Sequence, residues 1–187
     1  MKRQLILAAL VIGILFSCKK SNSSGSGPAI SGASSTYHLT CVIDGKATTF
    51  NAKVLGTRII DANVTQVSVL GYTGESGSNI QSLGLTWTNT SADATFGMGT
   101  WTDTSTKYSV AGVYDITSTD AFESGTNATG QAFRDGKQIT NHLKITYTLV
   151  DSSTLKGTFS GDFYDMGLIP GVKKTITDGD FWVQWKK

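Results

Sequence analysis

Two histidines are the residues of this chain whose type is most often catalytic or metal-binding. Strand alternation places His38 and His142 each alone on a polar side, so a shared site would need the fold to bring them together. The sequence contains no G-x-S-x-G elbow, H-E-x-x-H pair, P-loop, G-x-G-x-x-G turn or EF-hand loop. This favours histidines in local hydrogen bonds, although a Ser, His and Asp triad assembled in space stays open.

The acids offer a second chemistry. Asp115, Asp120, Glu123 and Asp135 lie in or beside the segment from Thr117 to Lys137, which is too polar and glycine-rich for a core and reads as a long connection. Two of these carboxylates and some backbone carbonyls could hold Ca²⁺, which takes six to eight oxygen ligands in flexible geometry. The alternative is a loop with solvated charges, and no other cofactor is indicated.

The tryptophans offer a third kind of chemistry, ligand binding, because an exposed indole can stack on a sugar ring. Trp87 follows Leu83 and Leu85 on one strand face, so we expect it in the core, and the same alternation buries Trp185 behind Phe181 and Val183. Trp182 is expected to point away from the core, and Trp101 lies in a short strand beside the polar residues Thr100, Thr102 and Asp103. With Tyr108 nearby in sequence to Trp101, they are the predicted ligand-binding aromatics; the alternative is a second core layer.

The elements that must position these residues are strands. Residues 37–187 alternate apolar and polar side chains, are rich in Thr, Val, Ile and aromatics, and show no helical period. Asp44-Gly45 is typical of a tight hairpin turn, and Asp178-Gly179 predicts either a break or a bulge in the last strand. The expected strands are Tyr37–Ile43, Ala47–Leu55, Val64–Tyr72, Ile80–Thr88, Gly99–Thr102, Tyr108–Thr117, 142–150, Leu155–Tyr164 and Lys173–Trp185.

Eight to ten short strands predict an all-β domain, an antiparallel β-sandwich or a flattened barrel. The irregular spacing of strand glycines, such as Gly71, Gly84, Gly112 and Gly161, favours the sandwich.

The start of the chain resembles a lipoprotein export signal. Lys2 and Arg3 precede an apolar run from Leu5 to Phe16, which is too short to cross about 30 Å of hydrocarbon. The run ends in Leu15-Phe16-Ser17-Cys18, which resembles a lipobox with a bulky residue where a small one is commoner. We therefore predict a signal peptide at 1–17, a lipidated Cys18 and a Ser- and Gly-rich tether to residue 36. No aspartate follows Cys18, which favours the outer membrane; the side that the domain faces stays open.

Charge and cysteines narrow the function. The sequence carries 16 Lys and Arg against 14 Asp and Glu, and the signal removes two of the bases, so the mature chain is neutral. A neutral domain lacks the basic face of a nucleic-acid binder, so we exclude nucleic acid as a partner. With Cys18 assigned to the anchor, Cys41 has no disulfide partner, and its place in an alternating strand predicts a buried, inert thiol.

Four motifs run through the domain: Asp44-Gly45-Lys46, Gly99-Thr100-Trp101, Gly157 to Gly161 (GTFSG) and Ile176 to Val183 (ITDGDFWV). Together with the lipobox and the tether, they resemble small Bacteroidota lipoproteins of unknown function. The resemblance implies an all-β domain and supplies no catalytic residues.

The expected function is that of a non-enzymatic, membrane-anchored binding module for a glycan or an envelope protein. Alternatives are a lipocalin-like carrier with an apolar cavity, a hydrolase in which a histidine approaches an acid and a hydroxyl, or a purely structural lipoprotein.

Overall fold

The computed structural model describes residues 37–61, 64–77, 79–89, 95–117, 120–125, 139–165 and 172–186, all within the compact unit Ala33–Lys187. The predicted signal peptide, Cys18, the tether and Asp135 lie outside the described residues. Within the described ranges, no helix has the length and apolarity that a membrane crossing requires.

The described part of the domain contains eleven strands, which confirms the all-β prediction. Their bounds are β1 (His38–Ile43), β2 (Lys46–Thr49), β3 (Lys53–Asp61), β4 (Val64–Tyr72), β5 (Ser82–Asn89), β6 (Gly99–Thr102), β7 (Tyr108–Thr117), β8 (Asp120–Gly125), β9 (Lys144–Val150), β10 (Thr154–Asp165) and β11 (Lys173–Lys186).

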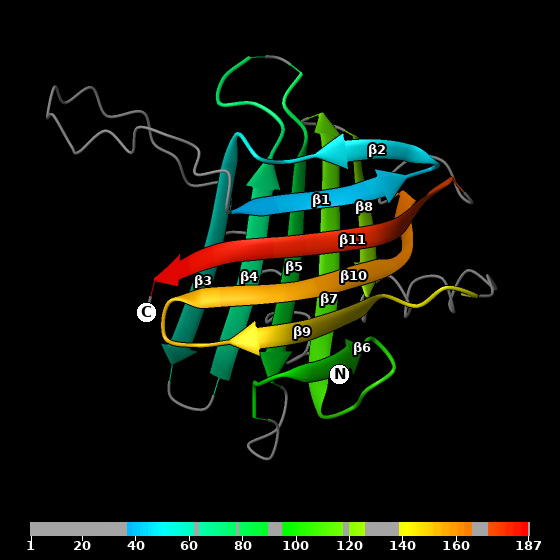
Figure 1. Ribbon diagram of the computed structural model, residues 1–187. Coiled ribbons are helices and arrows are strands. Elements are labelled where there is room, and N and C mark those ends of the chain that lie inside the picture. Colours follow the sequence, from blue (N-terminus) through cyan, green and yellow to red (C-terminus); the bar gives the residue numbers. More distant parts are fainter. Residues whose placement is uncertain are drawn as a thin grey trace, which may run out of the picture. The chain divides into compact units, whose positions relative to one another are not determined.

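The strands form two layers that are joined at both ends. The front layer in Figure 1 has the order β2-β1-β11-β10-β9-β6, and the layer behind it has the order β3-β4-β5-β7-β8. Strands of one layer run across those of the other (Figure 1). One corner pairs β11 with β3 through Trp185↔Gly56, and the opposite corner pairs β10 with β8 through Tyr164↔Glu123. The architecture is therefore a sandwich with two closed corners, which makes it a flattened barrel as well.

Strand alternation builds the core between the layers. Trp87 is fully buried and Trp185 is 3% exposed, as the sequence predicts, and Phe181 and Val183 are buried beside Trp185. Burial of each such side chain stabilises the fold by roughly 1.5 to 3 kcal/mol. The largest fully buried side chains include Phe50, Phe163 and Tyr147. These bulky side chains lie in the core between the two layers.

Both Asp-Gly dipeptides lie where the backbone departs from a regular strand, one at a turn and one at a bulge. Asp44 and Gly45 have φ angles of 49° and 81° between β1 and β2, which confirms the predicted hairpin turn. Asp178 has a φ of 50° inside β11, where one residue of β1 or of β10 lies opposite two residues of β11. This is the predicted bulge, and it lets Ile176 and Phe181, five positions apart, both face the core.

Two sequence-based boundaries are wrong. The expected strand Ala47–Leu55 is two strands, because the chain turns at Phe50 and β3 then pairs with β4 and β11 instead of β1. The expected connection from Thr117 to Lys137 contains β8, whose Phe122 is buried and whose residues pair with β7. Such hairpin pairing can hold a strand that its own composition does not predict. These two differences turn the nine expected ranges into eleven strands, above the expected eight to ten.

Candidate functional site

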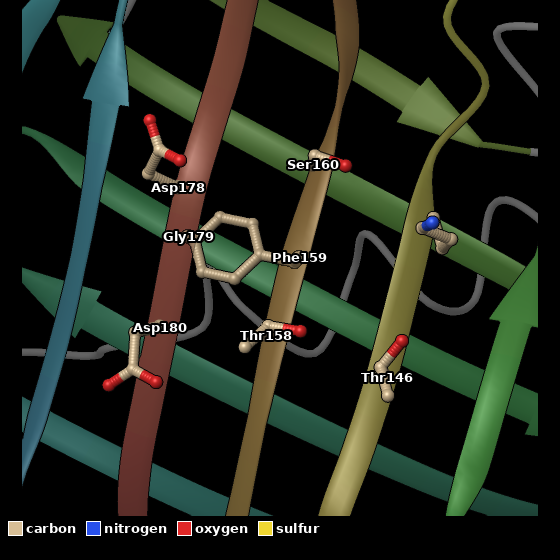
Figure 2. A pocket seen from close by; sticks show the side chains of 8 residues that line it. Thr146, Thr158, Phe159, Ser160, Asp178, Gly179 and Asp180 are labelled. Carbon is tan, nitrogen blue, oxygen red and sulfur yellow. The ribbon is translucent and has the colours of Figure 1, made fainter.

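The outer face of the front layer is hollowed over three neighbouring strands. The groove has a volume of about 350 Å³ and opens to solvent. Its lining comes from β9, β10 and β11 (Figure 2) and consists of Lys144, Thr146, Thr158, Phe159, Ser160, Asp178, Gly179 and Asp180. Hydroxyls, two carboxylates and one ammonium therefore face a shared concave surface.

Strand register sets the spacing of these polar groups. Thr146 pairs with Thr158, and Thr158 pairs with Asp180, so the three side chains lie side by side (Figure 2). Directly paired residues on one sheet face have Cβ atoms about 5 Å apart. The sheet therefore presents two hydroxyls and a carboxylate at regular intervals across its strands.

The bulge in β11 supplies the second carboxylate. It places both Asp178 and Asp180 among the exposed residues of the outer face, while Gly179 between them is buried. Asp178 accepts a hydrogen bond from the hydroxyl of Thr177 at 3.1 Å. Because the left-handed conformation of Asp178 is fixed by the bulge, this carboxylate is held at the rim of the groove instead of following the ordinary strand alternation.

An aromatic ring closes the floor. Gly179 pairs with Phe159, and a Cβ added to Gly179 would lie 2.6 Å from Phe159 Cδ1 and 2.5 Å from its carbonyl oxygen. The ring lies in the gap between β10 and β11 (Figure 2). Only glycine allows this approach, so Gly179 is what leaves an apolar floor between the two aspartates.

His38 and Trp182 extend the polar face beside the groove. His38 Nε2 lies 2.5 Å from Asp180 Oδ1, and His38 pairs across the strands with Trp182. The Trp182 ring is half-buried on the outer face, as expected, with Lys156 Nζ 3.4 Å from its centroid and Tyr37 against its edge. Its indole N–H has no partner among the described residues. Lys156 therefore covers one face of the indole at the margin of the groove.

Trp101 and Tyr108 do not share this face. Trp101 pairs with the buried Ile145, so its side chain points to the inner side of the front layer. Its ring packs at 5.4 Å on Trp87 and at 4.8 Å on Tyr108, and its N–H donates to the carbonyl of Gly97. Trp101 and Tyr108 are thus a second layer on the core, which the sequence left open as the alternative, and the three predicted aromatics form no common platform.

The predicted calcium ligands also diverge. Asp115 and Glu123 lie on the outer face of the back layer, where burial raises the pKa of each and the charge of Asp115 raises that of Glu123 further. Ser82 donates to Asp115 at 2.9 Å. Asp120 lies on the opposite face of β8. Burial raises the pKa of Tyr114, and the charge of Asp120 raises this pKa further. The part of the chain that the structure describes holds no group of three His, Cys, Asp or Glu placed for a metal ion.

Each histidine has an acidic partner. Beside the His38 and Asp180 pair, His142 Nδ1 lies 2.9 Å from Oδ1 of Asp103, whose side chain is 2% exposed. This confirms the expectation of locally hydrogen-bonded histidines. His142 precedes β9 instead of lying in that strand, as the sequence had suggested.

Six of the eight groove residues lie in the GTFSG and ITDGDFWV motifs noted in the sequence, but the sequence assigned none of the eight a binding role. Lys144 and Thr146 lie outside both motifs. Comparisons with protein-family models, with curated proteins and with solved structures find no match for this chain. The groove, defined by the eight residues above, is accordingly the strongest basis for a functional proposal.

Proposed function

We propose that the protein is a lipid-anchored, non-enzymatic module of the bacterial envelope that binds glycans in the groove between β9 and β11. The observation that carries the proposal is the concave surface on which Thr146, Thr158, Ser160, Asp178 and Asp180 converge over the ring of Phe159. A sugar presents hydroxyls that donate and accept hydrogen bonds and apolar C–H faces. The groove offers hydrogen-bonding partners for the hydroxyls, whereas Phe159 on its floor is 3% exposed and offers little area for stacking.

The polar groups of the groove match hydroxyl ligands better than anionic ones. Carboxylates accept hydrogen bonds that are roughly twice as strong as those between neutral groups. Threonine and serine hydroxyls can act as donor or acceptor according to the ligand. Two carboxylates against the single ammonium of Lys144 leave an excess of negative charge, which disfavours anionic ligands.

The first experiment is a glycan array probed with the full chain in detergent. We expect binding to neutral glycans, and a loss of affinity of roughly tenfold or more in Asp180→Asn, because a hydrogen bond to a charged group contributes about 1.5 to 3 kcal/mol. Glu75→Gln, an exposed acid outside the groove, is the matched control. Equal binding by both variants, or binding only to proteins of an envelope extract, would contradict the glycan proposal.

The anchor is supported by the sequence alone. A diacylglycerol thioether and an amide-linked acyl chain on Cys18 would hold the protein firmly, because each buried methylene contributes about 0.8 kcal/mol. The 18 residues from Lys19 to Thr36 would let the domain move about 23 Å from the anchor. Mass spectrometry should find the lipids on the wild type and none on Cys18→Ser. Fractionation should place the protein in the outer membrane, and protease treatment of intact cells decides which side it faces.

A further inference from the structure

One row of polar side chains crosses all six strands of the front layer. It is traced by the strand pairs Thr100↔Thr146, Thr146↔Thr158, Thr158↔Asp180, Asp180↔Thr40 and Thr40↔Thr49. All six side chains belong to the outer face, where each is exposed or half-buried. We call them the threonine row. The groove occupies only its middle, at Thr146, Thr158 and Asp180.

The row is long compared with any single sugar. Neighbouring strands lie about 4.8 Å apart, so five steps between six strands span about 24 Å. The bulges in β9 and β11 fall between other residue pairs, so each position of the row stays in register with the next. The row therefore offers one hydrogen-bonding group per strand over the whole width of the sheet.

Its chemistry is more uniform than that of the flanking rows. On one side, Lys156, Trp182 and His38 mix cationic and aromatic groups. In the row, every side chain except Asp180 is a threonine, whose branched Cβ restricts the rotamer and so fixes the direction of the hydroxyl. Thr100 and Thr146 already hydrogen-bond to each other at 2.9 Å between their Oγ1 atoms. A regular array of oriented hydroxyls suits a ligand with regularly repeated hydroxyls.

Resting on the proposed function, we propose that the ligand is an extended neutral oligosaccharide or polysaccharide that lies along the threonine row, across the strands. The internal units would occupy the groove beside Asp178 and Asp180, and the outer units would contact Thr100 at one end and Thr40 and Thr49 at the other. The two carboxylates in the middle of the path exclude uronic acids and sulfated sugars by repulsion. The site therefore binds the internal units of a sugar chain and not the end of that chain.

The test measures the binding of oligosaccharides of increasing length to the full-length protein in detergent by calorimetry. The probes are β-1,4-glucan, β-1,4-mannan and chitin oligosaccharides of one to six units. We expect the monosaccharides not to bind, and the association constant for one series to rise at least tenfold from the disaccharide to the hexasaccharide. Acidic oligosaccharides of galacturonic acid should not bind at any length.

Substitutions at the ends separate the row from the groove. Thr49→Val and Thr100→Val remove one hydroxyl each, so each should weaken hexasaccharide binding by about two- to tenfold. Thr49→Val should leave disaccharide binding unchanged, whereas Thr100→Val also removes the hydrogen-bond partner of Thr146 in the groove. Thr57→Val, an exposed residue of β3 on the other layer, is the matched control. Threonine pairs also stabilise sheets, so the melting temperature of every variant is measured beside its affinity.

The outcomes distinguish the two proposals. Affinity that does not depend on length, with Asp180→Asn still weakened and the end variants unchanged, overturns the threonine row and leaves the groove. Binding of galacturonic acid oligomers in place of neutral ones overturns the neutral-chain assignment. If the protein binds no glycan on the array, both proposals are overturned.

Discussion

Gly179→Ala should destabilise the domain, because the bulge in β11 leaves no room for a methyl group. The new Cβ would lie 2.5 Å from the carbonyl oxygen of Phe159 and 2.6 Å from Cδ1 of its ring. Neither atom can retreat easily, since Phe159 is buried in the core and its backbone is paired on both sides. Overpacking of this kind costs about 1 to 3 kcal/mol.

Thermal unfolding followed by circular dichroism measures the effect. For a domain of about 150 residues, 1 kcal/mol corresponds to roughly 2 to 4 °C, so the melting temperature should fall by about 2 to 12 °C. Gly84→Ala is the matched control, since its Cβ would lie 3.6 Å from Leu70 Cδ1, an ordinary contact. That variant should be neutral or more stable by up to about 1 kcal/mol, through a less flexible unfolded chain.

Equal melting temperatures for the two glycine variants would refute the packing argument, because the substitution is the same and only the surroundings differ. A fall for Gly179→Ala with unchanged glycan affinity in the folded fraction would show that the bulge tolerates a shift without moving Asp178 and Asp180. We expect both stability and affinity to fall, since the two aspartates flank the substituted residue.

Three further predictions concern polar groups that are buried or half-buried. Tyr147→Phe should stabilise the domain by about 1 to 2 kcal/mol in urea unfolding, since the buried hydroxyl has no partner among the described residues; a loss of stability would mean that it has one. Burial raises the pKa of Glu123 above its unfolded value, so stability is lost as the pH rises through the folded pKa. Glu123→Gln should therefore raise the melting temperature at pH 7 and leave it unchanged below about pH 4; the same gain at both values contradicts this. Burial raises the pKa of Cys41 to about 12, so in Cys18→Ser the one remaining thiol should react with Ellman's reagent at pH 8 only after urea is added.

The strands and the core could be predicted because their signal is local. In β5, Leu83, Leu85 and Trp87 repeat every second residue, and all three are fully buried. The same period placed Phe181 and Trp185 in the core. A period of two is dictated by backbone geometry and needs no knowledge of the partner strand. The tight turn at Asp44-Gly45 is equally local, since positive φ angles limit which residues fit.

The strand β8 and the closed corners could not be predicted in this way. Apart from Phe122, the residues from Asp120 to Gly125 carry no large apolar side chain, and the segment is extended because β7 pairs with it. The parallel contact of β11 with β3 joins Trp185 to Gly56, whose Cβ would lie 2.9 Å from atoms of Trp185 and Val183. Such contacts depend on tertiary packing, which overrides the weak preferences of a single segment.

The candidate site was missed for a related reason, which also explains why the tryptophans drew attention instead. A large aromatic residue signals possible recognition wherever it stands, but whether it reaches solvent depends on its cross-strand neighbour; Ile145 turns Trp101 inward. Threonine carries no such signal, because it is a common strand residue. Its meaning here arises only when register aligns Thr49 of β2 with Thr100 of β6 across four intervening strands. Which side chains share a sheet surface thus depends on pairings between distant segments, as in the contact of His38 with Asp180. A candidate site on such a surface can be found only once the strand order is known.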